Sequence, residues 1–238
     1  MKRLIAAAML VAALIGLFGS TVEMPGADMA VDVPAGWMVM TRSDAESETT
    51  AAMFGMTSED AVKMMEDGDF YLILYEPKTG AEMYVTVFGS QYAKQLRSMN
   101  WLTPDEVEIA KEDLLEGYSG WAYDSDVMAK QLGDFTYLAM TMHTEVGENR
   151  LDNRQLFTVY DGLEIYVDLY AKESELLETH AAAQDVLAAS LQVEYAQVKA
   201  QRAYRWVVFA AVGLLMMMLT QFVGIALTVM LRVREKMV

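Results

Sequence analysis

The feature that most constrains this chain is an apolar run at residues 206–231. The run contains no charged residue, and its clearly polar residues are Thr220, Gln221 and Thr228. At about 1.5 Å of rise per residue, a helix over this run is roughly 39 Å long, against about 30 Å for the hydrocarbon core of a bilayer. A helix of a soluble protein keeps a polar stripe, which this run lacks on every face. We therefore predict a transmembrane helix at residues 206–231.

Both ends of this run carry side chains that favour the boundary between membrane and water. Aromatic rings with a polar edge and long basic side chains are typical of that boundary. The residues of this kind are Tyr204, Arg205, Trp206, Arg232 and Arg234. We expect them at the membrane interface, with residues 196–205 as a juxtamembrane linker and residues 232–238 as a basic cytoplasmic tail.

The N-terminus has the layout of a secretory signal. Lys2 and Arg3 precede an apolar run at residues 4–18, and small and polar residues follow. Cleavage near residue 20 would leave a large residue where a small one is preferred, so residues 1–22 are interpreted as a signal peptide or as an uncleaved signal anchor. Either alternative places the following domain outside the cell membrane and the C-terminus in the cytoplasm. With the signal removed, the protein is single-pass.

The segment between the two apolar ends is strongly acidic. Residues 23–198 contain 33 of the 34 acidic residues and ten of the 18 basic ones, which gives this segment a formal charge of −23. Such a charge repels nucleic acid and anionic lipid surfaces, so we expect neither as a partner. The chain has no cysteine, which excludes disulfides, thiolate metal sites and cysteine nucleophiles.

Residues 31–195 read as one extracytoplasmic α+β domain. Thr57 followed by Asp60 is a capping-box pattern, Thr103 followed by Pro104 announces a second helix, and Asp161-Gly162 is typical of a type I′ hairpin turn. Strands are expected at 31–33, 37–41, 70–75, 83–88, 127–132, 135–143, 155–160, 163–170 and 191–195, and helices at 45–56, 58–67, 104–116 and 173–189. Helices grouped around consecutive antiparallel strands indicate an antiparallel sheet with helices packed on it.

Several short phrases of this domain resemble a family of exported bacterial domains with the PsbP-like α-β-α sandwich fold. The phrases are Val33-Pro34-Ala35-Gly36-Trp37 with Thr41-Arg42, Gly55-Met56-Thr57, Asp69-Phe70-Tyr71-Leu72, and Phe157-Thr158-Val159-Tyr160-Asp161-Gly162. The resemblance implies this sandwich fold and an exported location. That family includes many surface proteins of unassigned role, and the resemblance implies no catalytic residue.

No motif of a known catalytic centre is present in the sequence. The two histidines, His143 and His180, fall in an expected strand and an expected helix, and the sequence has no Gly-x-Ser-x-Gly elbow, His-Glu-x-x-His pair or Walker loop. We interpret both histidines as packed or surface residues, and we expect no cofactor and no catalytic residue.

Two acidic clusters are candidates for a Ca²⁺ site. Asp67 and Asp69 lie in one cluster, and Asp124 and Asp126 lie in the other. Carboxylate oxygens suit Ca²⁺, but neither cluster has the spacing of the twelve-residue calcium loop, so solvated turn residues are the favoured interpretation. A hydrolytic site formed by two carboxylates remains an alternative, because a segment with so many acidic residues contains pairs at every spacing.

Aromatic and methionine residues are interpreted as packing residues. Trp37, Trp101 and Trp121 lie next to expected element ends, and core packing is their favoured role. The 20 methionines read as flexible core filler, although methionine-rich surfaces also bind partners.

One face of the predicted transmembrane helix is suited to contact with another helix. Thr220, Gly224 and Thr228 recur every four residues, and Gln221 lies beside them. Small residues at this spacing allow close helix approach, and a glutamine can hydrogen-bond across the interface. The partner would be a second copy of the chain or a membrane or envelope protein.

The leading hypothesis is a membrane-anchored extracytoplasmic binding or accessory module that is not an enzyme. The alternative is an envelope hydrolase or a Ca²⁺-binding domain that uses surface carboxylates.

Overall fold

The computed structural model describes residues 20–117, 127–146, 149–171 and 174–195. The chain divides into two compact units, Met1–Val193 and Glu194–Val238, and only Glu194 and Tyr195 of the second unit lie in the described ranges. Within those ranges no helix is both long and apolar enough to cross a membrane. The predicted spanning segment at 206–231 lies outside them, as do its flanks and residues 1–19.

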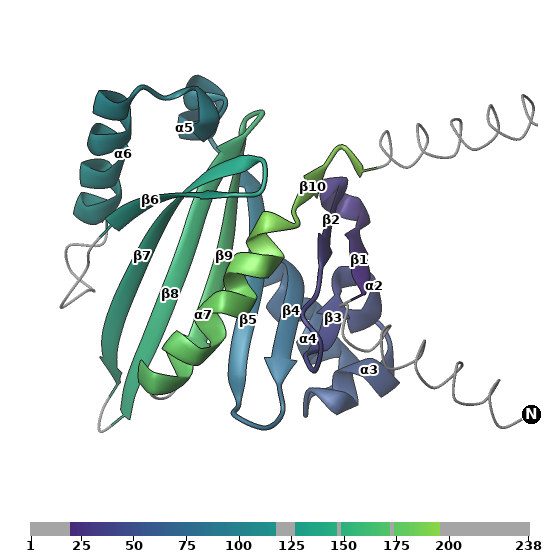
Figure 1. Ribbon diagram of the computed structural model, residues 1–238. Coiled ribbons are helices and arrows are strands. Elements are labelled where there is room, and N and C mark those ends of the chain that lie inside the picture. The colour runs from purple at the N-terminus through teal and green to yellow at the C-terminus, as the bar shows by residue number, and fades with distance from the viewer. Residues whose placement is uncertain (1–19, 118–126, 147–148, 172–173, 196–238) are drawn as a thin grey trace, which may run out of the picture. The chain divides into compact units, whose positions relative to one another are not determined.

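A seven-stranded sheet forms the centre of the first unit (Figure 1), with strand order β3-β4-β5-β9-β8-β7-β6. Its strands are β3 (Met38–Thr41), β4 (Phe70–Glu76), β5 (Ala81–Gly89), β6 (Val127–Leu132), β7 (Phe135–Val146), β8 (Asn149–Tyr160) and β9 (Leu163–Ala171). Every neighbouring pair is antiparallel. Strand β5 pairs with β9 although two helices and three strands separate them in the chain.

A second, three-stranded sheet has the order β1-β2-β10. It consists of β1 (Thr21–Met24), β2 (Met29–Asp32) and β10 (Gln192–Val193), with the 3₁₀ turn η1 (Pro25–Ala27) between the first two strands. Strand β1 differs from the sequence-based prediction, in which residues 21 and 22 end the signal segment. Its pairing with β2 places the start of the folded unit at or before Thr21.

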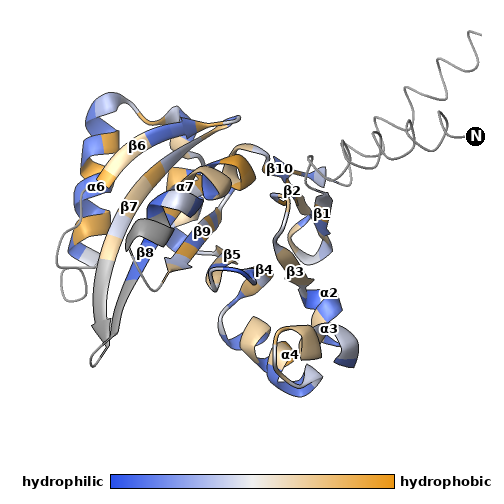
Figure 2. Ribbon diagram, turned by 60° about the horizontal axis from the view of Figure 1, so that its bottom comes forward, coloured by the Kyte–Doolittle hydropathy of each residue, from blue (hydrophilic) through white to orange (hydrophobic). Residues whose placement is uncertain are grey.

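Helices cover both faces of the large sheet. They are α2 (Arg42–Ala45), α3 (Glu48–Met53), α4 (Ser58–Asp67), α5 (Gln91–Leu96), α6 (Pro104–Gly117) and α7 (Ser174–Ala189), with the 3₁₀ turn η2 (Met99–Trp101) between α5 and α6. Figure 2 shows α6 and α7 on opposite sides of β6, β7 and β8, and α2, α3 and α4 beside the β3–β5 end of the sheet.

The alternation of side chains along each strand divides the core into three clusters. Val85, Leu156 and Val167 face the main cluster, to which α7 contributes Leu187. The next residue of a strand faces the other side, where two separate helix groups pack. There α2–α4 cover one end of the sheet, and α5 and α6 cover the other. On this second face, the side chains in the middle of the sheet therefore lie between the two helix groups.

The predicted antiparallel α+β architecture is confirmed, and several local predictions hold in detail. The Thr57 hydroxyl accepts from the Asp60 backbone N–H at 3.1 Å, as the capping box requires. Asp161 and Gly162 have φ of 46° and 82°, the positive values of a type I′ turn. Trp101, in contrast, is expected in the core but is 70% exposed on η2. Trp37 packs against the main core, and Trp121 lies outside the described residues.

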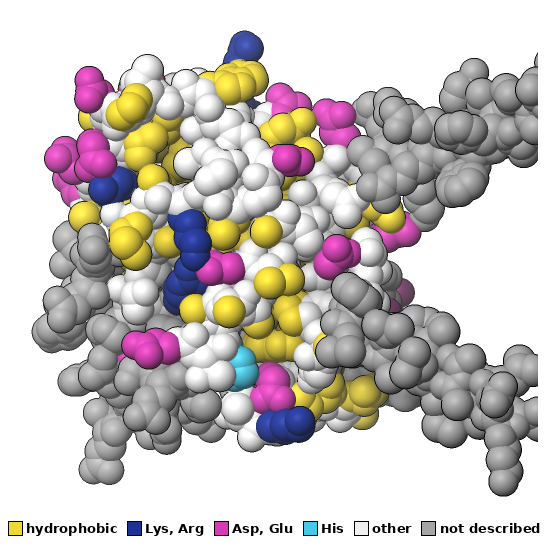
Figure 3. Space-filling view, viewed as in Figure 1, with side chains coloured by type: hydrophobic (Ala, Val, Ile, Leu, Met, Phe, Trp, Pro, Cys, Tyr) yellow, Lys and Arg dark blue, Asp and Glu magenta, His cyan; other side chains and the backbone are white. Residues whose placement is uncertain are grey.

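The surface reflects the acidic composition. On the face seen in Figure 3, acidic side chains are spread over the whole surface. Among the basic side chains, Lys130 and Arg154 both bind Asp185 of α7. Arg154 also donates to Gln184 Oε1 at 2.6 Å. These contacts fix α7 to β6 and β8.

Candidate functional site: a methionine-lined pocket

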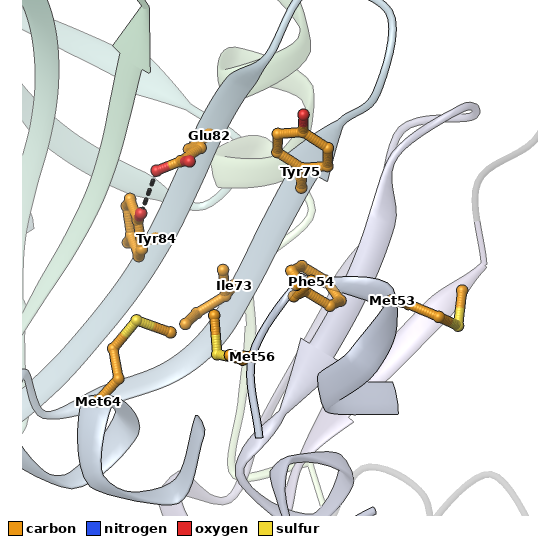
Figure 4. Close-up of a pocket in the computed structure, with 9 residues that line it drawn as sticks. Met53, Phe54, Met56, Met64, Ile73, Tyr75, Glu82 and Tyr84 are labelled. Carbon is orange, nitrogen blue, oxygen red and sulfur yellow. Dashed lines mark hydrogen bonds between the residues drawn. The ribbon is translucent and has the colours of Figure 1, made fainter. Parts of the chain in front are cut away.

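A pocket of about 470 Å³ lies where α3 and α4 meet strands β4 and β5 (Figure 4). Helix α3 ends at Met53, and Gly55, with φ of 77°, turns the chain toward Thr57, the N-cap of α4. This short connection places consecutive side chains at one wall of the pocket. The nine lining residues are Met53, Phe54, Gly55, Met56, Met64, Ile73, Tyr75, Glu82 and Tyr84.

Polar and apolar surface contribute about equally to the pocket wall, and the apolar part is adaptable. Met56 and Met64 point toward Ile73 in Figure 4, while Met53 lies apart at the rim. Met53 is 61% exposed, so the rim is open to solvent. The Phe54 and Tyr75 rings are 6.5 Å apart. Because thioether side chains are flexible and polarizable, such a wall adjusts to apolar groups of different shapes.

One end of the pocket is polar. The Tyr84 hydroxyl donates a hydrogen bond to Glu82 Oε2. Burial of the ring raises the pKa of Tyr84 well above its ordinary value of 10, and the hydrogen bond to Glu82 raises it further. Tyr84 is therefore neutral at physiological pH and keeps its proton on the hydrogen bond to the carboxylate. A carboxylate has several acceptor positions, so Glu82 can also accept from a donor on a ligand.

Beside Tyr84, a row of buried polar residues crosses the sheet. Tyr84 pairs in register with Asp168 of β9, and Asp168 pairs with Gln155 of β8. Gln155 Nε2 donates to Asp168 Oδ1 at 2.8 Å, and burial raises the pKa of Asp168 from 3.8 to about 6. Gln155 Oε1 and Asn153 Oδ1 are buried without a hydrogen-bond partner among the described residues. This row places buried polar groups beside the pocket, on the same face of the sheet.

The sequence-based candidates lie elsewhere. Asp67 is exposed at the end of α4, and Asp69 lies 3.6 Å from Arg42 Nη2. Arg42 is in turn held over the Tyr71 ring and donates to the Phe70 carbonyl. A guanidinium beside Asp69 competes with any bound cation.

Within the described ranges, no group of three or more His, Asp or Glu side chains is arranged to hold a metal ion. Several candidates lie outside those ranges, namely Asp124, Asp126, Tyr204, Arg205, Trp206, Thr220, Gln221, Gly224, Thr228, Arg232 and Arg234.

Of the two histidines, His180 has a structural position. Its Nε2 lies 3.0 Å from Thr79 Oγ1, and its ring meets the Trp37 ring edge-on at 5.3 Å. The Thr79 hydroxyl donates to Glu76 Oε2 at 2.6 Å, and this bond lowers the pKa of Glu76. The Thr79 hydroxyl therefore links the β4–β5 turn, through Glu76, to His180 of α7. His143 lies in β7, and its side chain is outside the described part.

The sequence does not single out the residues of this pocket. Its methionines have the pattern of core filler, and Glu82 and Tyr84 have that of ordinary strand residues. The useful local signal is Gly55-Met56-Thr57, which places a turn and a helix cap next to two apolar side chains.

Comparisons with known proteins identify no family for this chain. No protein-family model matches the sequence. No curated protein sequence matches it either. Among solved structures, a protein of Bacteroides thetaiotaomicron matches with a TM-score of 0.46 and 10% identity over 74% of this chain and 48% of that chain.

Two further structures are similar at the same low level. The cyanobacterial PsbP of Synechocystis has a TM-score of 0.41 and 14% identity, over 73% of this chain and 91% of that chain. LpqN of Mycobacterium tuberculosis is described as involved in cell envelope biogenesis. It has a TM-score of 0.39 and 11% identity, over 73% of this chain and 84% of that chain. Similarities at these scores do not assign the chain to a family or a function.

Proposed function

We propose that this protein is a single-pass, membrane-anchored extracytoplasmic binding module whose methionine-lined pocket takes a small molecule with an apolar part and a polar group. The observation that carries the proposal is the pocket itself, which is about 470 Å³ in volume, open at Met53 and closed by Glu82 and Tyr84. A concave wall that combines apolar side chains with a few placed polar groups is typical of ligand sites. A neutral ligand with one hydroxyl suits this wall, because a carboxylate on the ligand would be repelled by Glu82.

The anchoring and the location rest on the sequence. The apolar run at 206–231 and the N-terminal signal segment support a domain held outside the cell membrane. The PsbP-like sandwich is likewise a proposal, supported by the short phrases from Val33 to Gly162 and by helices on both faces of an antiparallel sheet.

A titration with 1-hexanol tests the pocket. The full chain, carrying ¹³C-labelled methionine methyl groups, is purified in a maltoside detergent and followed by NMR. We expect saturable shifts of the Met56 and Met64 methyl signals, with a Kd on the order of 1 mM from burial of the alkyl chain. The methyl signal of Met128, which is 60% exposed on β6, is the internal control.

Two variants make the test specific. Met56→Trp fills the pocket and is expected to abolish the shift of Met64, whereas Met128→Trp adds the same ring at a distant exposed site and leaves it intact. Equal, non-saturating shifts of Met64 and Met128 would show that hexanol only partitions into detergent, and the proposal would fail.

The alternative of Ca²⁺ binding at Asp67 and Asp69 has no supporting contact in the described structure. It is tested by titrating the same preparation with Ca²⁺ and following its melting temperature. A saturable rise that is lost in Asp69→Asn would favour the metal site.

A further inference from the structure

A second pocket, of about 370 Å³, lies at the other end of the same sheet face. It is lined by residues of α5, α6 and strands β8 and β9, and it shares no residue with the methionine-lined pocket. Its walls consist of the aromatic residues Tyr92, Phe157 and Tyr166, the carboxylates Asp113 and Glu164, and two aliphatic side chains of α6.

The three aromatic rings form one continuous wall. The Phe157 and Tyr166 rings are stacked, with centroids 4.7 Å apart and planes 29° apart. The Tyr92 ring, supplied by α5, is 6.5 Å from Phe157 at 30°. The faces of aromatic rings carry negative potential and attract cations, most strongly when the cation is removed from water. Tyr166 is stacked between Phe157 and Phe88, so Tyr92 and Phe157 are the rings whose faces a cation can contact.

Both carboxylates belong to the same pocket. Glu164 is 7% exposed and is held in place because Ser90 Oγ donates to its Oε1 and the Tyr166 hydroxyl donates to its Oε2 at 2.6 Å. Asp113 reaches the pocket from α6. Both carboxylates line the same pocket as Tyr92. Burial raises the pKa of Tyr92, and the negative charges of Asp113 and Glu164 raise it further.

The charge of this pocket is not compensated by its own lining. None of the lining residues is Lys, Arg or His. Two carboxylates in an apolar, aromatic surrounding favour a positively charged occupant, and the acidic domain as a whole attracts cations toward it. A bare divalent metal ion would need six or more oxygen ligands or waters, which an aromatic wall does not supply.

We propose that the pocket formed by Tyr92, Phe157, Tyr166, Asp113 and Glu164 binds a small organic ammonium ion, with alkylated nitrogen against the rings and its charge facing the two carboxylates. A quaternary or tertiary ammonium suits the site better than a primary one. Its alkyl groups contact the rings and it loses little hydration.

Calorimetric titration of the full chain in a maltoside detergent, which carries no ammonium group, tests the proposal. Choline is the ligand, and 3,3-dimethyl-1-butanol is its neutral counterpart of the same shape. We expect saturable binding of choline and tetramethylammonium and none of the neutral alcohol. Equal binding of the alcohol, or no saturable binding of either ammonium ion, overturns the proposal.

Matched variants locate the site. Asp113→Asn is expected to weaken choline binding about fivefold, whereas Glu112→Gln removes one charge from the neighbouring position of α6 and leaves affinity unchanged. Tyr92→Leu is expected to weaken binding about fivefold and Tyr92→Phe to preserve it. If Asp113→Asn and Glu112→Gln behave alike, choline responds only to the overall charge and the site is wrong.

A third ligand separates two sources of the same ammonium group. Glycerophosphocholine adds a phosphate, which the two carboxylates repel. If glycerophosphocholine binds more weakly than choline, the ligand is a free ammonium compound. If the two bind equally, the ligand is a phospholipid headgroup. Either result supports recognition of the ammonium group itself.

Discussion

At the scale of single residues, Asp168 is a carboxylate buried in the middle of the sheet. It is 8% exposed, lies between Tyr84 and Gln155 in register, and has a single neutral donor, Gln155 Nε2, on its Oδ1. Burial disfavours the charged carboxylate and raises its pKa to about 6, against 3.8 when solvated. The folded state therefore binds this proton more tightly than the unfolded state does.

The raised pKa predicts a pH-dependent cost to stability. The contribution of Asp168 is most favourable below pH 3.8, falls as the pH rises to about 6, and stays low above that value. The difference between the two pKa values corresponds to about 3 kcal/mol. We expect Asp168→Asn to gain up to about this amount in unfolding free energy, relative to the wild type, between pH 4 and pH 7.5, measured by chemical denaturation.

A matched control is Asp161→Asn, at an exposed turn where φ is 46° and Asn is well tolerated. It removes the same charge, and its free energy difference from the wild type should be the same at both pH values. A flat difference for Asp168→Asn as well would show that the Asp168 carboxylate stays ionised in the folded protein.

At the scale of elements, the β6–β7 turn and α7 approach each other through Gly133. Its φ is 57°, and a Cβ at this position would lie 2.1 Å from the Ala189 carbonyl oxygen. That contact is with backbone at the end of α7, so rotation of a side chain cannot relieve it. Gly133 is thus required both by the turn and by the packing of helix on sheet.

Comparison of Gly133→Ala with Gly80→Ala separates these two requirements. Gly80 has φ of 73°, and no atom of the described residues lies within 4 Å of the position that a Cβ would take there. Its replacement therefore costs only the backbone strain, about 1 kcal/mol. We expect Gly133→Ala to cost about 3 kcal/mol or more, because the clash adds to the strain. Thermal unfolding of the two variants measures the difference, and similar melting temperatures would mean that α7 shifts freely.

At the scale of the whole molecule, we predict from the sequence that a helix at 206–231 anchors the proposed binding domain in the membrane and presents a small-residue face. Gly224→Leu places a large side chain on that face and is expected to reduce self-association or co-purification with membrane partners at least severalfold. Ala226→Leu enlarges another small side chain, about 200° from Gly224 around the predicted helix, and serves as the control. Crosslinking in intact membranes is the measurement. Unchanged crosslinking in Gly224→Leu would leave the helix as an anchor alone.

Local signals in the sequence are sufficient for most elements of the described domain. Three features depend on residues within three or four positions of one another: the cap at Thr57, the helix start at Thr103-Pro104 and the turn at Asp161-Gly162. Such short-range interactions can be predicted from the sequence. Helix α5 is not predicted, because its cap, Ser90, is followed by only six helical residues, too few for a periodic pattern.

The sequence by itself determined an antiparallel α+β domain, its acidity and the expectation of a membrane anchor, because composition and short-range patterns carry that information. Only the tertiary structure decided that β5 lies beside β9, which brings Tyr84 next to Asp168 and Ser90 next to Glu164. Each pocket lies where a helix group packs on one pair of strands, α3 and α4 on β4 and β5, and α5 and α6 on β8 and β9. Such contacts join residues far apart in the chain, and no local pattern specifies them.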